Sequence, residues 1–141
     1  MITRNKILVW GVVICAVGFF FGYIAGQSPT SELPATSYQL PASLMVDYGD
    51  GMVRTYADLQ IEANASVLDI TKALAGREGL AFQTKDYGDL GLLVERIGAK
   101  KNGDDGKYWQ YWVNNVAIQK AADKLLAEAG DVIEWKFLNY K

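Results

Sequence analysis

The pattern of hydrophobic and polar residues changes three times along the 141-residue chain. Residues 7–25 carry no charge, residues 27–42 are rich in proline, serine and threonine, and the remainder mixes apolar with polar positions. This order predicts a cytoplasmic N-terminus at 1–6, a transmembrane anchor at 7–26 and a semi-extended linker at 27–42. A folded domain is expected at 43–141, where no proline interrupts the chain.

The first apolar run has the length of a membrane-spanning helix, which needs about 20 residues to cross ~30 Å of hydrocarbon. Arg4 and Lys6 precede the run, and no further cation occurs before Arg54. The positive-inside rule therefore predicts a single-pass protein of the cytoplasmic membrane with its C-terminal domain outside. A cleaved signal peptide is the alternative, but Tyr23 stands where cleavage after Ala25 requires a small residue.

Small residues recur on one side of this predicted helix. Gly18, Gly22 and Gly26 are spaced by four residues, which places them on one helical stripe. Such a stripe lets two membrane helices approach closely and predicts a weak homodimer. Alternatively, these glycines reflect only the general frequency of glycine in membrane helices.

In the folded domain, alternation and turn residues predict an α+β fold with one helix crossing a mixed sheet. The turn at 49–51 links a hairpin, and Ser66 with Asp69 resembles a capping box for a helix ending near Gly76. Strands are expected at 44–48, 52–61, 81–84, 92–97, 107–113, 116–118 and 132–137, and residues 121–129 are expected to form a short helix or helical turn.

The densest aromatic stretch of the chain is the expected strand at 107–113, Lys-Tyr-Trp-Gln-Tyr-Trp-Val. Alternation places Trp109, Tyr111 and Val113 on one face and the intervening residues, including Gln110 and Trp112, on the other. Aromatic residues on both faces indicate a central strand. These rings either pack in the core or form a flat platform for a planar ligand or a partner surface.

Composition excludes several classes of function. The formal net charge of −2 argues against a nucleic-acid partner, which requires a clustered basic face. The chain has no histidine and one cysteine, Cys15, so imidazole metal sites, Ser-His-Asp triads and an intrachain disulfide are excluded. The loop at 100–106 lacks the alternating oxygens of a calcium loop and is predicted to be a solvated hairpin loop. We expect no metal, no cofactor and no enzymatic activity.

The order of four sequence features resembles the transcobalamin-like C-terminal domain family. They are the hairpin, the helix Ser-Val-Leu-Asp-Ile-Thr-Lys-Ala-Leu, the aromatic strand ending in Val-Asn-Asn, and the closing Ala-Gly-Asp-Val-Ile-Glu-Trp. The resemblance covers residues 43–140 and implies a ubiquitin-like β-grasp fold. In the animal cobalamin carriers of this family, a Trp-Gln step that matches Trp109-Gln110 lies against the corrin.

The sequence therefore predicts a non-catalytic, extracytoplasmic binding module tethered to the membrane by residues 7–26. Its ligand would be a small planar molecule such as a corrinoid, contacted by Trp109, Gln110, Tyr111 and Trp112. We expect Trp109, Gln110 and Trp112 to share the binding face. The alternative is a protein-interaction or structural module of a cell-surface assembly.

Overall fold

The computed structural model describes residues 39–140 of the chain. The predicted transmembrane segment, with Gly18, Gly22 and Gly26, and most of the predicted linker lie outside the described residues. Within residues 39–140, no helix combines the length and the apolar character that crossing a membrane requires.

The described part is mostly β-structure with one α-helix, so the predicted α+β class is confirmed. Two short 3-10 turns, η1 and η2, interrupt the strands. In chain order the elements are β1 (Gln39–Asp47), β2 (Val53–Glu62), α2 (Val67–Arg77), β3 (Phe82–Asp86), η1 (Gly88–Leu90), β4 (Leu92–Ile97), β5 (Lys100–Lys101), η2 (Asp104–Gly106), β6 (Lys107–Val113), β7 (Val116–Ala117) and β8 (Val132–Asn139).

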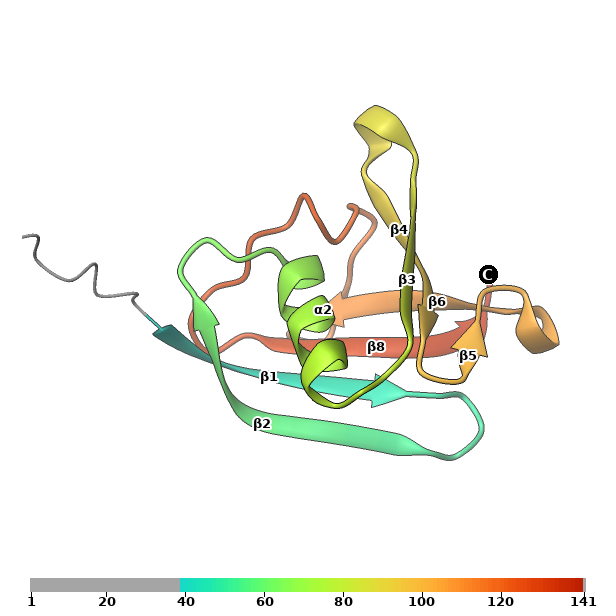
Figure 1. Cartoon of the computed structure of the whole chain (residues 1–141), viewed down its shortest axis with the longest axis horizontal. Helices are drawn as coiled ribbons and strands as arrows, with labels where there is room; N and C mark the ends of the chain where they lie inside the picture. The colour runs from blue at the N-terminus through green and yellow to red at the C-terminus, as the bar shows by residue number, and fades with distance from the viewer. Residues whose placement is uncertain (1–38, 141) are drawn as a thin grey trace, which may run out of the picture. The chain divides into compact units, whose positions relative to one another are not determined.

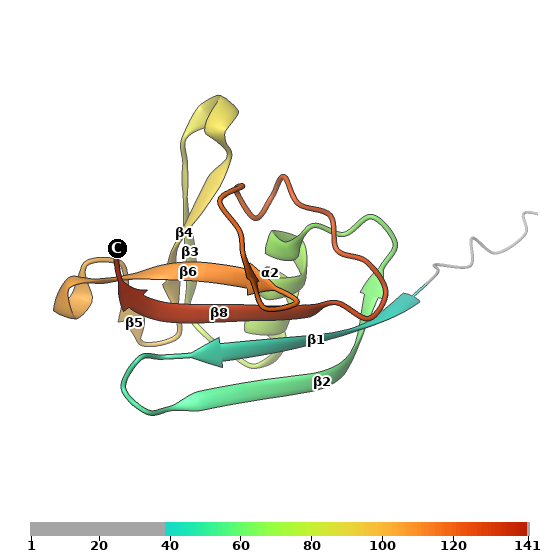
Figure 2. The same cartoon turned by 180° about the vertical axis from the view of Figure 1, so that it is seen from behind.

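The strands form two sheets (Figures 1 and 2). The larger sheet has the order β2-β1-β8-β6-β7, in which β1 and β8 run parallel and every other neighbouring pair is antiparallel. The predicted mixed sheet is therefore present. In the smaller sheet, β3-β4-β5, the β3–β4 hairpin projects away from the larger sheet in both views.

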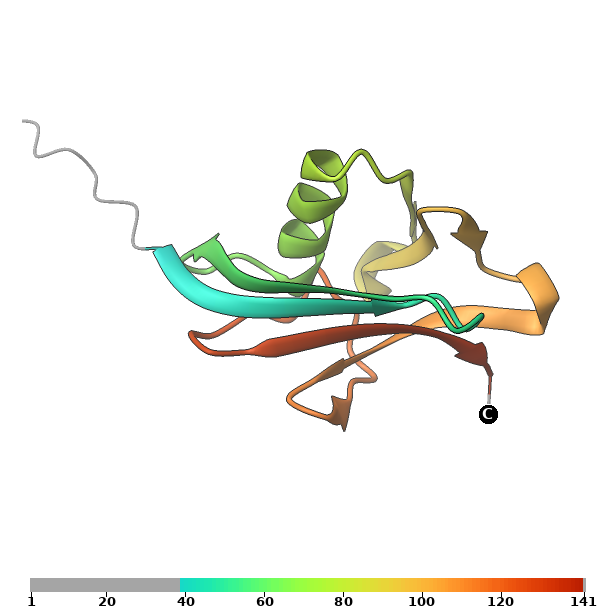
Figure 3. The same ribbon diagram turned by 90° about the horizontal axis from the view of Figure 1, so that it is seen from below.

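The helix α2 begins at the predicted capping box. The Asp69 N–H donates to the Ser66 hydroxyl oxygen (3.1 Å), and the Ser66 N–H donates to the Asp69 carboxylate (3.1 Å). The helix does not end at Gly76, as the sequence suggested, but continues to Arg77. Gly79, with φ +65°, takes the left-handed conformation after the helix instead. Figure 3 shows α2 lying across one face of the larger sheet.

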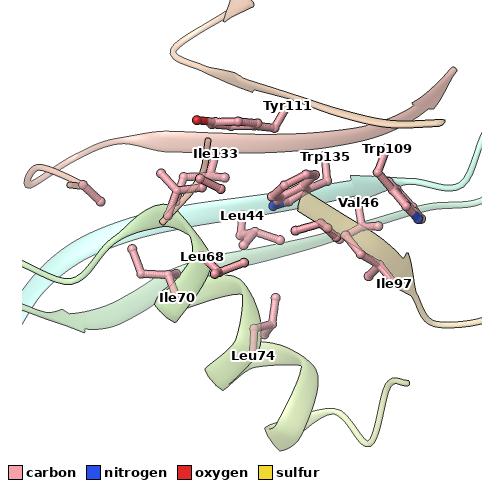
Figure 4. Close-up of a cluster of buried hydrophobic side chains, with 14 of the residues drawn as sticks. Leu44, Val46, Leu68, Ile70, Leu74, Ile97, Trp109, Tyr111, Ile133 and Trp135 are labelled. Atoms are coloured by element: carbon pink, nitrogen blue, oxygen red, sulfur yellow. The ribbon is translucent and has the colours of Figure 1, made fainter. Parts of the chain in front are cut away.

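The core lies between α2 and that face of the sheet (Figure 4). Leu44 and Val46 from β1, with Ile133, Trp135 and Phe137 from β8, are fully or nearly fully buried. The predicted alternation of β8 is thus confirmed. Within the core, the Trp135 indole N–H donates to the Thr71 hydroxyl at 2.9 Å, which ties the middle of the helix to the centre of the sheet.

Residues 121–129 form turns and irregular structure, so the predicted short helix or helical turn is wrong. One β-turn is closed by the Lys124 N–H, which donates to the Ala121 carbonyl at 3.0 Å. The carbonyls that a longer helix would use accept other donors. The N–H groups of Val67 and Leu68, in the first turn of α2, donate to the carbonyls of Leu125 and Ala122 at 2.9 and 3.1 Å.

The first strand also starts earlier than the sequence suggested. β1 begins at Gln39 and includes residues 39–42, which were assigned to the linker. Pro41 lies within this strand, and its carbonyl accepts the Gly130 N–H at 2.7 Å. The turn that follows β1 matches the predicted hairpin, with the Tyr48 N–H donating to the Met52 carbonyl at 2.9 Å.

The hydrogen bond between Trp135 and Thr71 yields a stability prediction. Thr71→Val keeps the side-chain volume but leaves the buried indole N–H without an acceptor, so the free energy of unfolding should fall by about 1–3 kcal/mol. Chemical denaturation followed by circular dichroism measures this change. Thr71→Ser retains the hydroxyl and serves as the control. Equal stability of the valine and wild-type proteins would contradict the assigned role.

The capping box predicts a pH dependence of stability. Hydrogen bonds from the hydroxyl and the N–H of Ser66 lower the pKa of Asp69 below its ordinary value. A carboxyl with a depressed folded-state pKa stabilises the fold above its unfolded pKa, about 4, and this stabilisation is lost as the pH falls through the folded pKa. The acid-induced loss of unfolding free energy should therefore be smaller in Asp69→Asn than in the wild type, as measured by denaturation at a series of acidic pH values.

Candidate functional site

The predicted binding residues of the aromatic strand lie on opposite sides of the larger sheet. Trp109 and Tyr111 point into the core, with 4% and 7% of their surface exposed. Gln110 and Trp112 point to the other side and are half-buried. The alternation predicted for this strand is therefore confirmed, and the assignment of Trp109, Gln110 and Trp112 to one binding face is wrong.

Trp109 and Tyr111 are core residues. The Trp109 ring meets Tyr48 edge-on with centroids 5.8 Å apart, and its indole N–H donates to the Lys100 carbonyl at 3.2 Å. Tyr111 packs against Trp135 with a centroid distance of 5.0 Å, and its hydroxyl donates to the Lys120 carbonyl at 2.6 Å. Burial, and secondarily the charge of Asp123, raise the pKa of Tyr111 to about 12. The phenol therefore stays neutral and acts as a donor.

The outward residues of β6 make polar contacts with β8. The Gln110 side-chain amide donates to the carbonyls of Leu138 and Asn139 at 3.5 and 3.4 Å. The Lys136 ammonium lies 4.7 Å from the centroid of the Trp112 ring and 3.0 Å from a Glu134 oxygen. The outer face of Trp112 is therefore partly covered by a cation and is not a bare apolar platform.

The edge of β6 that faces away from β8 is only partly occupied by other chain segments. β7 pairs with Trp112 and Val113 at one end. At the other end Asn102 joins β6 to β4, because its side-chain oxygen accepts the Trp109 N–H (2.8 Å) and its side-chain nitrogen donates to the Val94 carbonyl (2.9 Å). A side chain thus replaces the strand that would otherwise pair here.

Between these two ends lies a groove of about 590 Å³. One wall is the β3–β4 hairpin, where Leu90 and Leu93 expose 79% and 42% of their surface. The opposite wall is the segment 117–122, and the base includes all four residues 109–112. The predicted site residues therefore do meet at one groove, but they do so along the edge of the strand and not on one of its faces.

A close backbone approach holds the two walls of the groove together. The Asp123 carboxylate accepts the Leu92 N–H at 2.9 Å. Gly91 makes this contact feasible, since a Cβ at this position would lie 2.6 Å from an Asp123 oxygen and 2.7 Å from the Ala121 Cβ. Gly91 also has φ +98°, which disfavours any other residue. The shape of the groove therefore depends on this glycine.

A second hollow of about 410 Å³ adjoins the groove and shares Leu93, Trp109, Gln110 and Tyr140 with it. Tyr108, which also lines it, meets Tyr140 edge-on at 6.4 Å. The two hollows together extend around the edge of β6 to its outward side.

No group of three or more potential metal ligands occurs within residues 39–140. In the loop at 100–106, the Asp104 carboxylate accepts the Lys101 N–H at 2.8 Å, and Asn102 is used in the bridge between β4 and β6. Asp86 likewise accepts the Gly88 N–H at 2.7 Å and shapes its turn. These oxygen atoms have structural partners.

Sequence reasoning missed the groove itself. Leu90 lies in a stretch of turn residues, where an apolar residue with no core partner is a weak signal of a binding surface. Asn102 lies in the loop at 100–106 that was predicted to be solvated, and no local pattern indicates that its side chain bridges two strands. The wall at 117–122 was expected to be part of a strand and a helix.

The family model described as "Domain of unknown function (DUF4430)" matches residues 64–139. The chain belongs to this family. The matched region includes α2, the β3–β4 hairpin, Asn102 and all of β6, and therefore all of the groove lining except Tyr140. No curated protein matches the chain.

Two solved structures share the fold of this DUF4430 domain. A protein from Ruminococcus gnavus ATCC 29149 that is proposed to bind metal is 16% identical, with a TM-score of 0.56, and the match covers 72% of this chain and 99% of that one. Haptocorrin in complex with Cbi is 12% identical, with a TM-score of 0.65, and the match covers 74% of this chain and 26% of haptocorrin. The likeness to haptocorrin supports the resemblance to transcobalamin-like domains.

The Asn102 bridge yields a prediction for the groove. Asn102→Ala removes the acceptor of the Trp109 N–H and the donor to Val94, so the unfolding free energy should fall by about 1–3 kcal/mol. Hydrogen exchange of the Trp109 amide should accelerate as the hairpin wall loosens. Asn139→Ala, at an exposed position, is the matched control. An unchanged exchange rate in Asn102→Ala would refute the bridging role.

Proposed function

We propose that this protein is a non-catalytic binding module, tethered to the membrane and displayed on its extracytoplasmic side, that takes a small planar ligand in the groove beside β6. The groove is the observation that carries the proposal. Its hairpin wall exposes two leucines, and sites for small ligands are commonly concave and lined mostly by apolar side chains.

The proposed ligand class is a corrinoid. The fold likeness to corrinoid-binding haptocorrin motivates this choice, and the Trp109-Gln110 step that resembles the carriers lies at the base of the groove. The groove is open on one side and this chain matches only 26% of haptocorrin, so the module would contact part of a corrin. A partial site buries less of the ligand and predicts weak binding.

The strand order supports a ubiquitin-like β-grasp assignment as part of this proposal. The two central strands β1 and β8 are parallel, each is flanked by an antiparallel partner, and α2 crosses one face. For the membrane tether, the support is the uncharged run at 7–25 with Arg4 and Lys6 before it.

Calorimetric titration of the full chain in detergent micelles with hydroxocobalamin tests the proposed function. We expect saturable binding that weakens about tenfold in Leu93→Ser, because that substitution removes apolar surface worth roughly 1–2 kcal/mol from the groove wall. Leu126→Ser is the matched control, since Leu126 is 54% exposed and lies outside the groove.

An absence of heat with the wild-type protein would exclude the corrinoid. Equal affinity in Leu93→Ser and Leu126→Ser would move the binding site away from the groove. Circular dichroism of each variant checks that it remains folded.

The projecting hairpin favours one alternative, a protein-interaction module. Its tip carries Leu90 and Tyr87, both exposed, and it stands clear of the larger sheet (Figure 1). Exposed apolar residues at such a tip suit contact with a protein surface. If hydroxocobalamin does not bind, the hairpin tip becomes the place to search for a partner.

A further inference from the structure

The open edge of β6 presents two backbone groups to the groove. On this edge the Trp109 N–H donates to Asn102 at 2.8 Å, and the Tyr111 carbonyl accepts the Ile118 N–H at 3.1 Å. In an antiparallel strand the N–H and C=O of one residue point to the same side. The Trp109 carbonyl and the Tyr111 N–H therefore point to this edge as well.

Neither of these two groups has a hydrogen-bond partner within residues 39–140. β8 pairs along the opposite side of β6, and β7 reaches only Trp112 and Val113. Ile118 donates to the Tyr111 carbonyl, but the reverse bond, from the Tyr111 N–H to the Ile118 carbonyl, is absent from the described residues. Unpaired backbone groups on an open strand edge can form hydrogen bonds with another molecule.

The two groups form an acceptor and a donor on either side of Gln110, at the base of the groove. We propose that they bind a carboxamide of the ligand, with its N–H donating to the Trp109 carbonyl and its oxygen accepting the Tyr111 N–H. The leucines of the hairpin would cover the apolar part of the ligand. This inference rests on the proposed function, which supplies a small ligand in the groove.

The Trp109 carbonyl and the Tyr111 N–H together favour some chemical groups of a ligand over others. A primary amide presents a donor and an acceptor side by side. A carboxylate offers no donor and would place an oxygen against the Trp109 carbonyl, and an ester lacks the N–H as well. An ammonium group has no acceptor for the Tyr111 N–H. The edge therefore distinguishes an amide from its closest analogues.

An added peptide strand would meet the same two groups but would gain little more. Asn102 already occupies the Trp109 N–H on one side, and Ile118 already occupies the Tyr111 carbonyl on the other. Strand addition depends on a series of main-chain hydrogen bonds, and here the series stops after one residue. The occupied flanks favour a small carboxamide over an extended peptide.

Selective isotope labelling can observe each group directly. The sequence contains Trp-Gln once and Gln-Tyr once, at 109–110 and 110–111. Protein labelled with carbonyl-¹³C Trp and ¹⁵N Gln gives one NMR correlation across a peptide bond, and this correlation reports on the Trp109 carbonyl. Labelling with carbonyl-¹³C Gln and ¹⁵N Tyr likewise gives one correlation, which reports on the Tyr111 N–H. Trp112-Val113, also unique, gives an internal control, because alternation turns the Trp112 carbonyl toward β8.

The probe is isovaleramide, titrated into the full chain in detergent micelles and compared with isovalerate and methyl isovalerate. We expect saturable shifts of the Trp109 carbonyl and the Tyr111 N–H with the amide, a constant Trp112 carbonyl, and at least tenfold weaker binding of the acid and the ester. Binding of the ester as tight as that of the amide, or no shift at either reporter, would overturn the inference.

Two further outcomes separate this inference from the proposed function. If isovaleramide shifts both reporters but hydroxocobalamin does not bind, the amide site is supported and only the corrinoid is excluded as the ligand. Binding of hydroxocobalamin with both reporters unchanged would overturn the amide site and leave the proposed function. Tighter binding of N-acetyl-leucine N-methylamide than of isovaleramide would refute the preference for a primary carboxamide over a peptide.

Discussion

The contact between α2 and β8 is the constraint on which the rest of the domain depends. Trp135 is buried beneath the helix, and its indole N–H is satisfied by Thr71. Sliding the helix along the sheet would leave that donor unpaired in the core, which is costly. Because Tyr111 pairs with Trp135 in the β6–β8 register, the orientation of β8 also decides which residues of β6 face inward. The direction of the open backbone edge follows from the same register.

The larger sheet protects its two edges by different means. At β2 a shift in register accompanies the positive φ of Asp58 (+55°), and such bulges discourage further pairing along an edge. At β6 the protection comes from a side chain, Asn102, and from the segment after β7. This second arrangement covers the ends of the edge and leaves its middle accessible.

Much of the fold could be predicted from local sequence patterns. The capping box at Ser66 and the alternation of β8 depend on neighbouring residues and were correct. The helix expected at 121–129 does not form, because carbonyls of this segment accept hydrogen bonds from the first turn of α2. This contact joins segments that are far apart in the sequence. The site shows the same limit. Alternation assigned the faces of β6, but it carries no information on what lies beside a strand.

The parallel pairing of β1 with β8 has a consequence for how the domain reaches its native state. Leu44 pairs with Ile133, so the first and the last described strands are neighbours at the centre of the sheet. Contacts between residues so far apart in sequence slow folding, because the chain loses loop entropy before the pairing stabilises it. The central strand pair can form only after β8 has been synthesised. Until then the edge of β1 that pairs with β8 has no partner strand, although β2 and α2, which precede β8 in the chain, are already present.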